Sequence, residues 1–272
     1  MDMDVFDTNR AWVKVDKVNH RKVSLQRRLK NISYALSGVA AAVLLMVALS
    51  LTGWFDREQE VTVSLTADYG NRSEIVLPDG STVKLNSGSE VTYAYNPQKK
   101  VREIRFQGEG YFDVSKSKRP FVVKMANGVE VKVLGTTFNL KAYPDDPTIR
   151  ASLIEGHIEL EHQNDRLVMK AGEMAEFDKR TNRLEQVEGD LSHSYGWLKN
   201  KLYMDDMSLA DVCKYLERWY NVDIAVQEDL GEQIRYNGVI QEDTIAEVME
   251  ALSKLSNIAY HVKGKHISIT SK

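Results

Sequence analysis

Cysteine and the short motifs of catalysis are scarce in this 272-residue chain. Its one cysteine, Cys213, has no second thiol for an intrachain disulfide, and we expect it to pack as a small apolar residue on a helix. The sequence has no HExxH, GxSxG, P-loop or CxxC motif, which argues against the enzyme and zinc-site classes that use them. The net charge of −3 argues against a nucleic-acid partner.

Metal-ligand patterns are also lacking. The six histidines form no recognisable ligand set. His157 and His162 lie five apart on one predicted strand, a spacing that sends them to opposite faces. We interpret Asp145-Asp146 as a solvated turn rather than a calcium site. The sequence therefore predicts no metal, no cofactor and no enzymatic activity.

Charge is absent from Ile32 to Phe55, although 28% of the chain is charged. A bilayer core takes roughly 20 apolar residues as a helix, so we predict a transmembrane helix over residues 32–55. A cleaved signal peptide is the alternative, but its apolar core runs only about 7–15 residues and ends in a small-x-small site. Trp54-Phe55-Asp56 is not such a site. A buried soluble helix is disfavoured because the segment has no charged face.

The charges on either side of this segment predict its orientation. Between Arg10 and Lys30 the chain has one acid, Asp16, among many bases, whereas Asp56, Arg57, Glu58 and Glu60 follow the segment. The bases are Arg10, Lys14, Lys17, Arg21, Lys22, Arg27, Arg28 and Lys30. The positive-inside rule places the tail, residues 1–31, in the cytoplasm and the remainder across the inner (cytoplasmic) membrane, in the periplasm. The bases also suit anionic lipid.

The cytoplasmic tail contains one short amphipathic pattern. Asp7 and its neighbours are good N-cap residues, and Ala11, Val15 and Val18 then share one helical stripe with Trp12 beside it. One interpretation is a helix that lies on the membrane surface. The other is a partner-binding helix with Trp12 as anchor and Val15 and Val18 in support, since Trp is enriched among interface hot spots. The tail alone does not decide between them.

Residues 60–190 have the pattern of an all-β domain. Residues 129–133 alternate apolar and charged, as do residues 104–106 and 158–161. Asn127-Gly128 between two valine-rich runs predicts a hairpin. We expect Gly108 and Gly110 to reverse the chain between two strands, and Gly80 to serve a turn after Asp79. The expected core includes Phe112, Val114, Phe121 and Phe138. The architecture is predicted to be a β-sandwich or β-roll.

Residues 195–272 predict a small α+β domain. Ser208 can cap a helix with Leu209, Val212, Cys213, Leu216 and Trp219 on one face. Residues 221–226 and 234–240 read as strands, and Asp243 or Thr244 begins a second helix. Residues 258–262 and 266–269 then form a terminal hairpin about Lys263-Gly264-Lys265. The predicted order is helix, strand, strand, helix, strand, strand, with two similar halves.

Six sequence fragments follow one another in a fixed order: LPDGSTVKLN (77–86), GEGYFDV (108–114), RPFVV (119–123), VKVLGTTFNLKAY (131–143), SLIEGHIEL (152–160) and AGE (171–173). This ordered series resembles the FecR family of single-pass membrane anti-sigma factors. Together they follow one apolar span, and the resemblance extends over residues 60–272. The C-terminal region also resembles the short N-terminal signalling module of secretins and TonB-dependent outer-membrane receptors.

The resemblance implies a function in signalling. The tail would bind an extracytoplasmic-function sigma factor, and the periplasmic part would contact the signalling domain of a TonB-dependent receptor. An envelope binding or scaffold protein of the same fold, without a sigma factor, is the alternative. Some proteins of this type cleave themselves at a Gly-Thr bond, which here would be Gly135-Thr136. Alternatively, Gly135 only permits a bend that Thr136 caps.

Overall fold

The computed structural model describes residues 30–34, 36–49, 61–95, 101–241 and 243–272. An N-terminal helix extends over Lys30–Leu49, with residue 35 outside the described set. Its mean hydropathy of 2.2 and its length of 20 residues make it long and apolar enough to cross a membrane. The helix begins two residues before the predicted span, and the predicted end, residues 50–55, lies outside the described residues. The helix and residues 60–272 are separate units.

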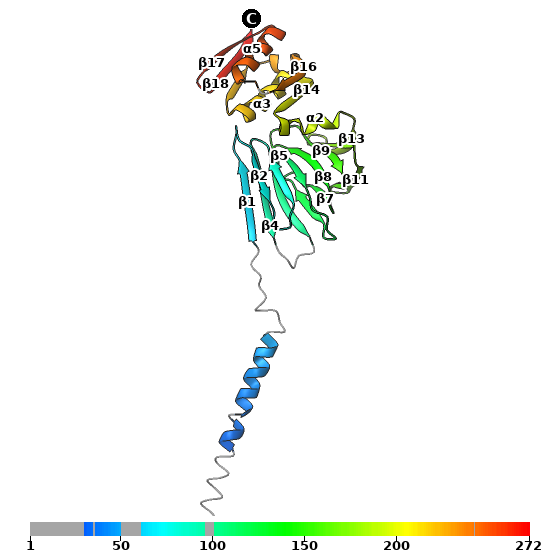
Figure 1. The fold of residues 1–272 in the computed structure, drawn as a ribbon, viewed down its shortest axis with the longest axis vertical. Coiled ribbons are helices and arrows are strands. Elements are labelled where there is room, and N and C mark those ends of the chain that lie inside the picture. The colour runs from blue at the N-terminus through cyan, green and yellow to red at the C-terminus, as the bar shows by residue number, and fades with distance from the viewer. Residues whose placement is uncertain (1–29, 35, 50–60, 96–100, 242) are drawn as a thin grey trace, which may run out of the picture. The chain divides into compact units, whose positions relative to one another are not determined.

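The large β domain is built from two sheets that share one long strand, β5 (Arg102–Asp113). Sheet A has the order β1-β4-β5-β6-β7-β10-β11, and sheet B the order β2-β3-β5-β8-β9-β12-β13 (Figure 1). The other strands are β1 (Val61–Ala67), β2 (Ser73–Val76), β3 (Thr82–Leu85), β4 (Ser89–Tyr95), β6 (Phe121–Lys124), β7 (Val129–Val133), β8 (Thr137–Ala142), β9 (Thr148–Glu155), β10 (His157–His162), β11 (Asp165–Lys170), β12 (Met174–Asp178) and β13 (Arg183–Val187).

The core of this domain lies between the inner faces of the two sheets. Strand β7 alternates buried and half-buried residues as the valine pattern predicted, and the β6–β7 hairpin turns at Asn127-Gly128 with Gly128 at φ +75°. The four residues predicted as core, Phe112, Val114, Phe121 and Phe138, are buried. Phe112 and Phe138 stack with ring centroids 4.9 Å apart. The predicted all-β architecture is confirmed.

The expected chain reversal at Gly108 and Gly110 is wrong. Strand β5 continues through both glycines, leaving β4 at Gln107 and pairing with β8 from Gly108 onward. Gly108 has φ +102°, and a Cβ there would lie 2.5 Å from the Cα of Ser89. A glycine is required because the strand bends there and another strand approaches closely. The Gly-Glu-Gly segment therefore carries β5 from one sheet into the other.

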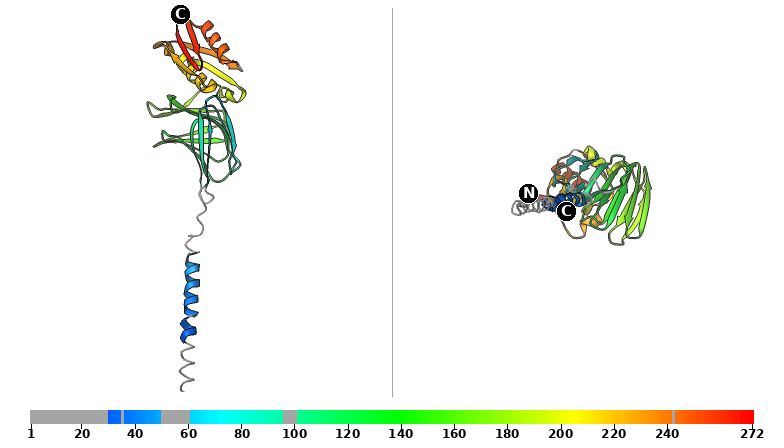
Figure 2. Two further views of the ribbon diagram at one scale, coloured as in Figure 1. Left: turned by 90° about the vertical axis from the view of Figure 1, so that its left-hand side faces the viewer. Right: turned by 90° about the horizontal axis from the view of Figure 1, so that it is seen from below.

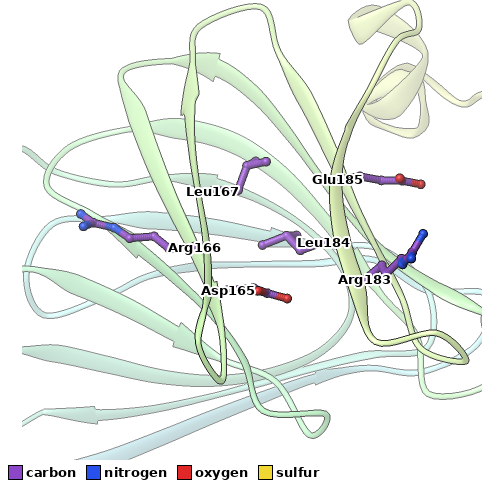
Figure 3. A pocket seen from close by; sticks show the side chains of 6 residues that line it. All are labelled: Asp165, Arg166, Leu167, Arg183, Leu184 and Glu185. Carbon is purple, nitrogen blue, oxygen red and sulfur yellow. The ribbon is translucent and has the colours of Figure 1, made fainter.

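The outer edges of the two sheets approach each other at β11 and β13. A shallow hollow of about 330 Å³ lies there, lined by Asp165, Arg166, Leu167, Arg183, Leu184 and Glu185. Figure 3 shows Leu167 and Leu184 turned toward the space between the strands, whereas Arg166 and Arg183 point away from it. Both leucines are half-buried and pack on the core. The hollow is therefore the charged seam where the two sheets end.

The C-terminal module, residues 201–272, has its own core and two small sheets (Figure 2). Strand β14 pairs with β16, and β18 lies between β15 and β17. The elements are β14 (Lys201–Ser208), α3 (Leu209–Tyr220), β15 (Asp223–Val226), α4 (Leu230–Gln233), β16 (Arg235–Gln241), α5 (Ile245–Leu255), β17 (Ile258–Lys263) and β18 (His266–Ser271). A connector, residues 188–200, carries α2 (Leu191–Ser194) and the 3₁₀ turn η1 (Gly196–Lys199).

The predicted helices and terminal hairpin of the module are present. Ser208 caps α3 by accepting a hydrogen bond from the Asp211 amide, and Thr244 caps α5 in a capping box with Glu247. Cys213 is buried on α3 as predicted, and its burial raises the pKa of the thiol to about 12. The predicted order of elements lacks β14. Each half of the module therefore begins with a strand rather than a helix.

Candidate functional site

The outward face of sheet B carries two cross-strand rows of mostly polar side chains. Glu109 on β5 lies opposite Lys141 on β8, which lies opposite Arg150 on β9. In the next row, Asn139 on β8 lies opposite Ser152 on β9. The core residues Phe138 and Leu140 alternate with these positions and point inward. This is the pattern of a sheet with one face on the core and one face in water.

Part of this polar face is nevertheless buried, because the connector and the module cover it. Trp197 of η1 donates its indole N–H to Asn139 Oδ1 at 3.0 Å. Glu109 is only 4% exposed and accepts hydrogen bonds from the side-chain amides of Asn86 and Asn139, at 2.7 and 3.2 Å. Burial raises the pKa of Glu109, against the opposing effects of Lys141 and the two amides. We call the contact of the β domain with the connector and the module the junction.

Arg218 of α3 makes an ion pair across the junction. Its Nη2 lies 2.6 Å from Asp146 Oδ1 and 2.8 Å from Asp145 Oδ2, and its guanidinium lies 3.8 Å from the centroid of the Tyr143 ring. Burial alone would raise the pKa of Asp146, but Lys141 and Arg218 lower it below its usual range. The interpretation of Asp145-Asp146 as a solvated turn is wrong for Asp146, which is largely buried and paired.

A second cation crosses the junction in the opposite direction. Arg72, in the segment between β1 and β2, lies with its guanidinium 4.8 Å from the centroid of the Trp219 ring and 5.7 Å from that of Trp197. Its Nε donates to Asn86 Oδ1 at 3.0 Å. The nearby Gly70 amide donates to the carbonyl of Arg218 at 2.8 Å. The end of α3 is thus held by a loop of the β domain.

The junction is incompletely packed. A cleft of about 470 Å³ lies between sheet B, the connector and the module, and its lining includes Glu109, Asn139, Ser152, Trp197 and Tyr215. Ser152 is 1% exposed, and its Oγ has no hydrogen-bond partner among the described residues. A buried hydroxyl without a partner costs about 1–3 kcal/mol. Protein atoms therefore leave part of the junction unfilled.

The bond proposed for self-cleavage, Gly135-Thr136, lies between β7 and β8. Thr136 is buried, and its Oγ1 donates to the carbonyl of His157 at 3.0 Å. Gly135 is not at positive φ, but a Cβ there would lie 2.7 Å from the Cα of Lys116. The glycine therefore permits a close approach of two chain segments.

Among the residues that the structure describes, no other sequence-predicted position lies at this site. Trp12, Val15 and Val18 lie outside the described residues. His157 is exposed and His162 buried against Phe177, so the two do lie on opposite faces of β10. In the described part of the chain, no group of three His, Cys, Asp or Glu residues could hold a metal ion.

Sequence reasoning missed the junction residues Arg72, Trp197 and Arg218. The available signal was weak: Arg218 is a charged residue inside the aromatic run from Tyr215 to Tyr220, on a helix whose other buried positions are apolar. An arginine in that position predicts a buried partner, and Asp145-Asp146 provides one. Nothing in the sequence identifies which acid it contacts.

Comparisons with known proteins agree with this architecture. The family model described as FecR protein matches residues 63–159, and the model described as FecR, C-terminal, matches residues 201–269. Two crystal structures of a candidate anti-sigma factor from Parabacteroides distasonis ATCC 8503, at 1.65 and 2.50 Å resolution, are similar to this chain. Their TM-scores are 0.71 and 0.72 at 24% identity, covering 77% and 78% of this chain and 99% and 100% of theirs. No curated protein matches.

Proposed function

This chain belongs to the FecR family, and we propose that it is a membrane-anchored anti-sigma factor that relays a signal across the inner membrane. The observation that carries the proposal is the order of parts. A basic N-terminal tail precedes one helix long and apolar enough to cross a membrane, and both FecR regions follow it. This order gives one protein a surface on each side of the membrane.

The cytoplasmic tail is the proposed binding segment for an extracytoplasmic-function sigma factor. Trp12 is the proposed anchor because a large aromatic side chain can supply most of the binding energy of a small interface. Val15 and Val18, on the predicted helical stripe beside Trp12, are the proposed supporting contacts. In the alternative function, an envelope scaffold of the same fold, this helix would only lie on the membrane and no sigma factor would bind.

Binding of a sigma factor by the full-length protein in detergent micelles distinguishes these functions. We expect Trp12→Ala to weaken binding by about 2 kcal/mol, roughly thirtyfold in Kd. Lys14→Gln is the matched control, because it alters a charge within the same predicted helix and should change Kd by less than about threefold. Equal binding by wild type and Trp12→Ala would assign Trp12 to the lipid surface. Absence of binding to any sigma factor of the same cell would favour the scaffold.

On the other side of the membrane, the proposed partner of the C-terminal module is the signalling domain of a TonB-dependent outer-membrane receptor. The module has unpaired strand edges in the described residues: β17, for example, pairs only with β18. An exposed edge can accept a partner strand through main-chain hydrogen bonds. A chain lacking residues 196–272 should then lose its response to the inducing ligand, whereas a retained response would assign the module a bracing role.

Cleavage at Gly135-Thr136 is a further part of the proposal. The Thr136 hydroxyl would attack the carbonyl carbon of Gly135, transfer the acyl group from nitrogen to oxygen, and leave an ester that water hydrolyses. In the intact chain this hydroxyl donates its hydrogen to the carbonyl of His157. A carbonyl oxygen is a weak base, so the Thr136 hydroxyl would have to break its hydrogen bond to His157 before cleavage.

A further inference from the structure

The outward face of sheet B has the composition of a surface that is stable in water. Its outward positions on β5, β8 and β9 are mostly charged or hydroxyl-bearing, and only the module and connector bury some of them. An interface that must never open usually has a more apolar centre. Uncovering this face would return Glu109, Asn139 and Ser152 to water, and Met174 on β12 would be the apolar side chain exposed beside Ser152.

The module also needs no residue of the β domain to complete its core. Its buried cluster contains only residues from Leu202 to Ile269, and the buried cluster of the β domain ends at Phe177. Each part would therefore keep its hydrophobic core after separation. Two parts with separate hydrophobic cores and a limited contact between them can move relative to each other.

The contacts that hold the junction are few and directional. Arg218 pairs with Asp146 and stacks on Tyr143, Trp197 donates to Asn139, and Arg72 lies against Trp219. Around them lie the 470 Å³ cleft and the unpartnered Ser152 hydroxyl. Water can replace hydrogen bonds and ion pairs of this kind, and separation would also relieve the buried Ser152 and Glu109.

We propose that the C-terminal module is a detachable cap on the outward face of sheet B, which separates as a folded unit when the Arg218 contact is broken. A partner that binds only the detached module shifts this equilibrium by its difference in affinity for the two states. The use of this step in signalling rests on the function proposed above, but the detachment itself is a property of this chain alone.

Spin-label distance measurements on the full-length protein in lipid nanodiscs test the proposal. Labels are attached at Val76→Cys on β2 and Leu255→Cys on α5, both largely exposed positions. Cys213 can remain, because its buried thiol with a pKa of about 12 is unreactive at neutral pH. Amide hydrogen exchange in α3 and β8 reports whether each core stays folded.

In Arg218→Met we expect a second, broader distance distribution whose fraction is at least about tenfold that in wild type. The amides of both cores should stay protected from hydrogen exchange. The matched control is Arg235→Met, which removes an exposed arginine that pairs with Asp206 within the module. It should leave the distances unchanged. A single unchanged distance in Arg218→Met would overturn the proposal, and so would loss of protection in α3, because the module would then unfold rather than detach. No sigma factor or receptor is present, so failure here is distinct from failure of the anti-sigma function.

Discussion

Replacement of Arg218 by methionine is the sharpest test of how the junction is held. Methionine keeps much of the apolar stem of the arginine side chain but removes the guanidinium. Arg218 is 4% exposed, and its guanidinium contacts Asp146, Asp145 and the face of Tyr143. The substitution therefore removes three contacts, while methionine and arginine have similar helix propensities on α3.

The expected loss follows from the surroundings of each partner. Breaking a buried ion pair costs about 3–5 kcal/mol when the remaining charge has no other partner. Here Asp146 keeps Lys141, whose Nζ lies 3.1 Å from its Oδ2, so we expect the lower end of this range. Asp145 is 56% exposed and contributes little. Loss of the contact with Tyr143 adds about 1 kcal/mol, which the packing of methionine partly offsets. The total is about 3 kcal/mol.

Urea unfolding of the full-length protein, followed through tryptophan fluorescence, measures this loss. Asp145→Asn is the control and should cost less than about 1 kcal/mol. The double substitution Arg218→Met with Asp146→Asn should lower the free energy of unfolding by less than the sum of the two single substitutions. The reason is that it removes both charges of the ion pair, so neither is left buried without the other. If Arg218→Met stays within about 0.5 kcal/mol of wild type, the ion pair contributes nothing net and the reasoning fails.

Four further predictions follow from the sequence and the contacts. A reporter active only in the periplasm should work when fused after Lys272 and not after Lys30; the reverse pattern would contradict the positive-inside assignment. If Gly135-Thr136 is cleaved, purified wild-type protein should give two fragments separated at this bond, and Thr136→Ala should stay intact. An intact wild-type chain would contradict self-cleavage and leave Gly135-Thr136 as a bend. Gly108→Ala should lower the free energy of unfolding in urea by about 3 kcal/mol or more, because φ is +102° and Ser89 occupies the space that the Cβ would need. Gly128→Ala, with φ +75° and open space around the Cβ, should lower it by about 1 kcal/mol. Equal losses would contradict the close approach of Ser89 to Gly108. Because the pKa of Asp146 is lowered in the folded chain, its contribution to the free energy of unfolding is complete above about pH 5. That contribution is lost as pH falls below the ordinary pKa of 3.8. A difference in stability between wild type and Asp146→Asn that stays constant from pH 7 to pH 3 would refute this assignment.

Periodicity predicted most of the fold because it reports which face of an element is buried. It failed where one signal has two physical causes. Gly108 and Gly110 were assigned to a chain reversal because glycine is common in turns, but a strand that bends against a neighbour needs the same residue. Strand β14 was missed because a bulge between Met204 and Met207 breaks its alternation, and two adjacent aspartates stand in the bulge.

The junction was beyond sequence reasoning for a different reason. Alternation on β8 predicts that Asn139 and Lys141 face outward, and they do, but the pattern of a sheet facing water is identical whether or not a second unit later covers that face. Only the covering side carries a hint, in Arg218 among aromatic residues on α3. This ambiguity is informative, because a face whose residues suit both water and the module has no strong preference between them. A contact built from such a face can act as a switch: a partner that binds the open state about 10⁴-fold more tightly than the closed state would move it from about 1% to about 99% open.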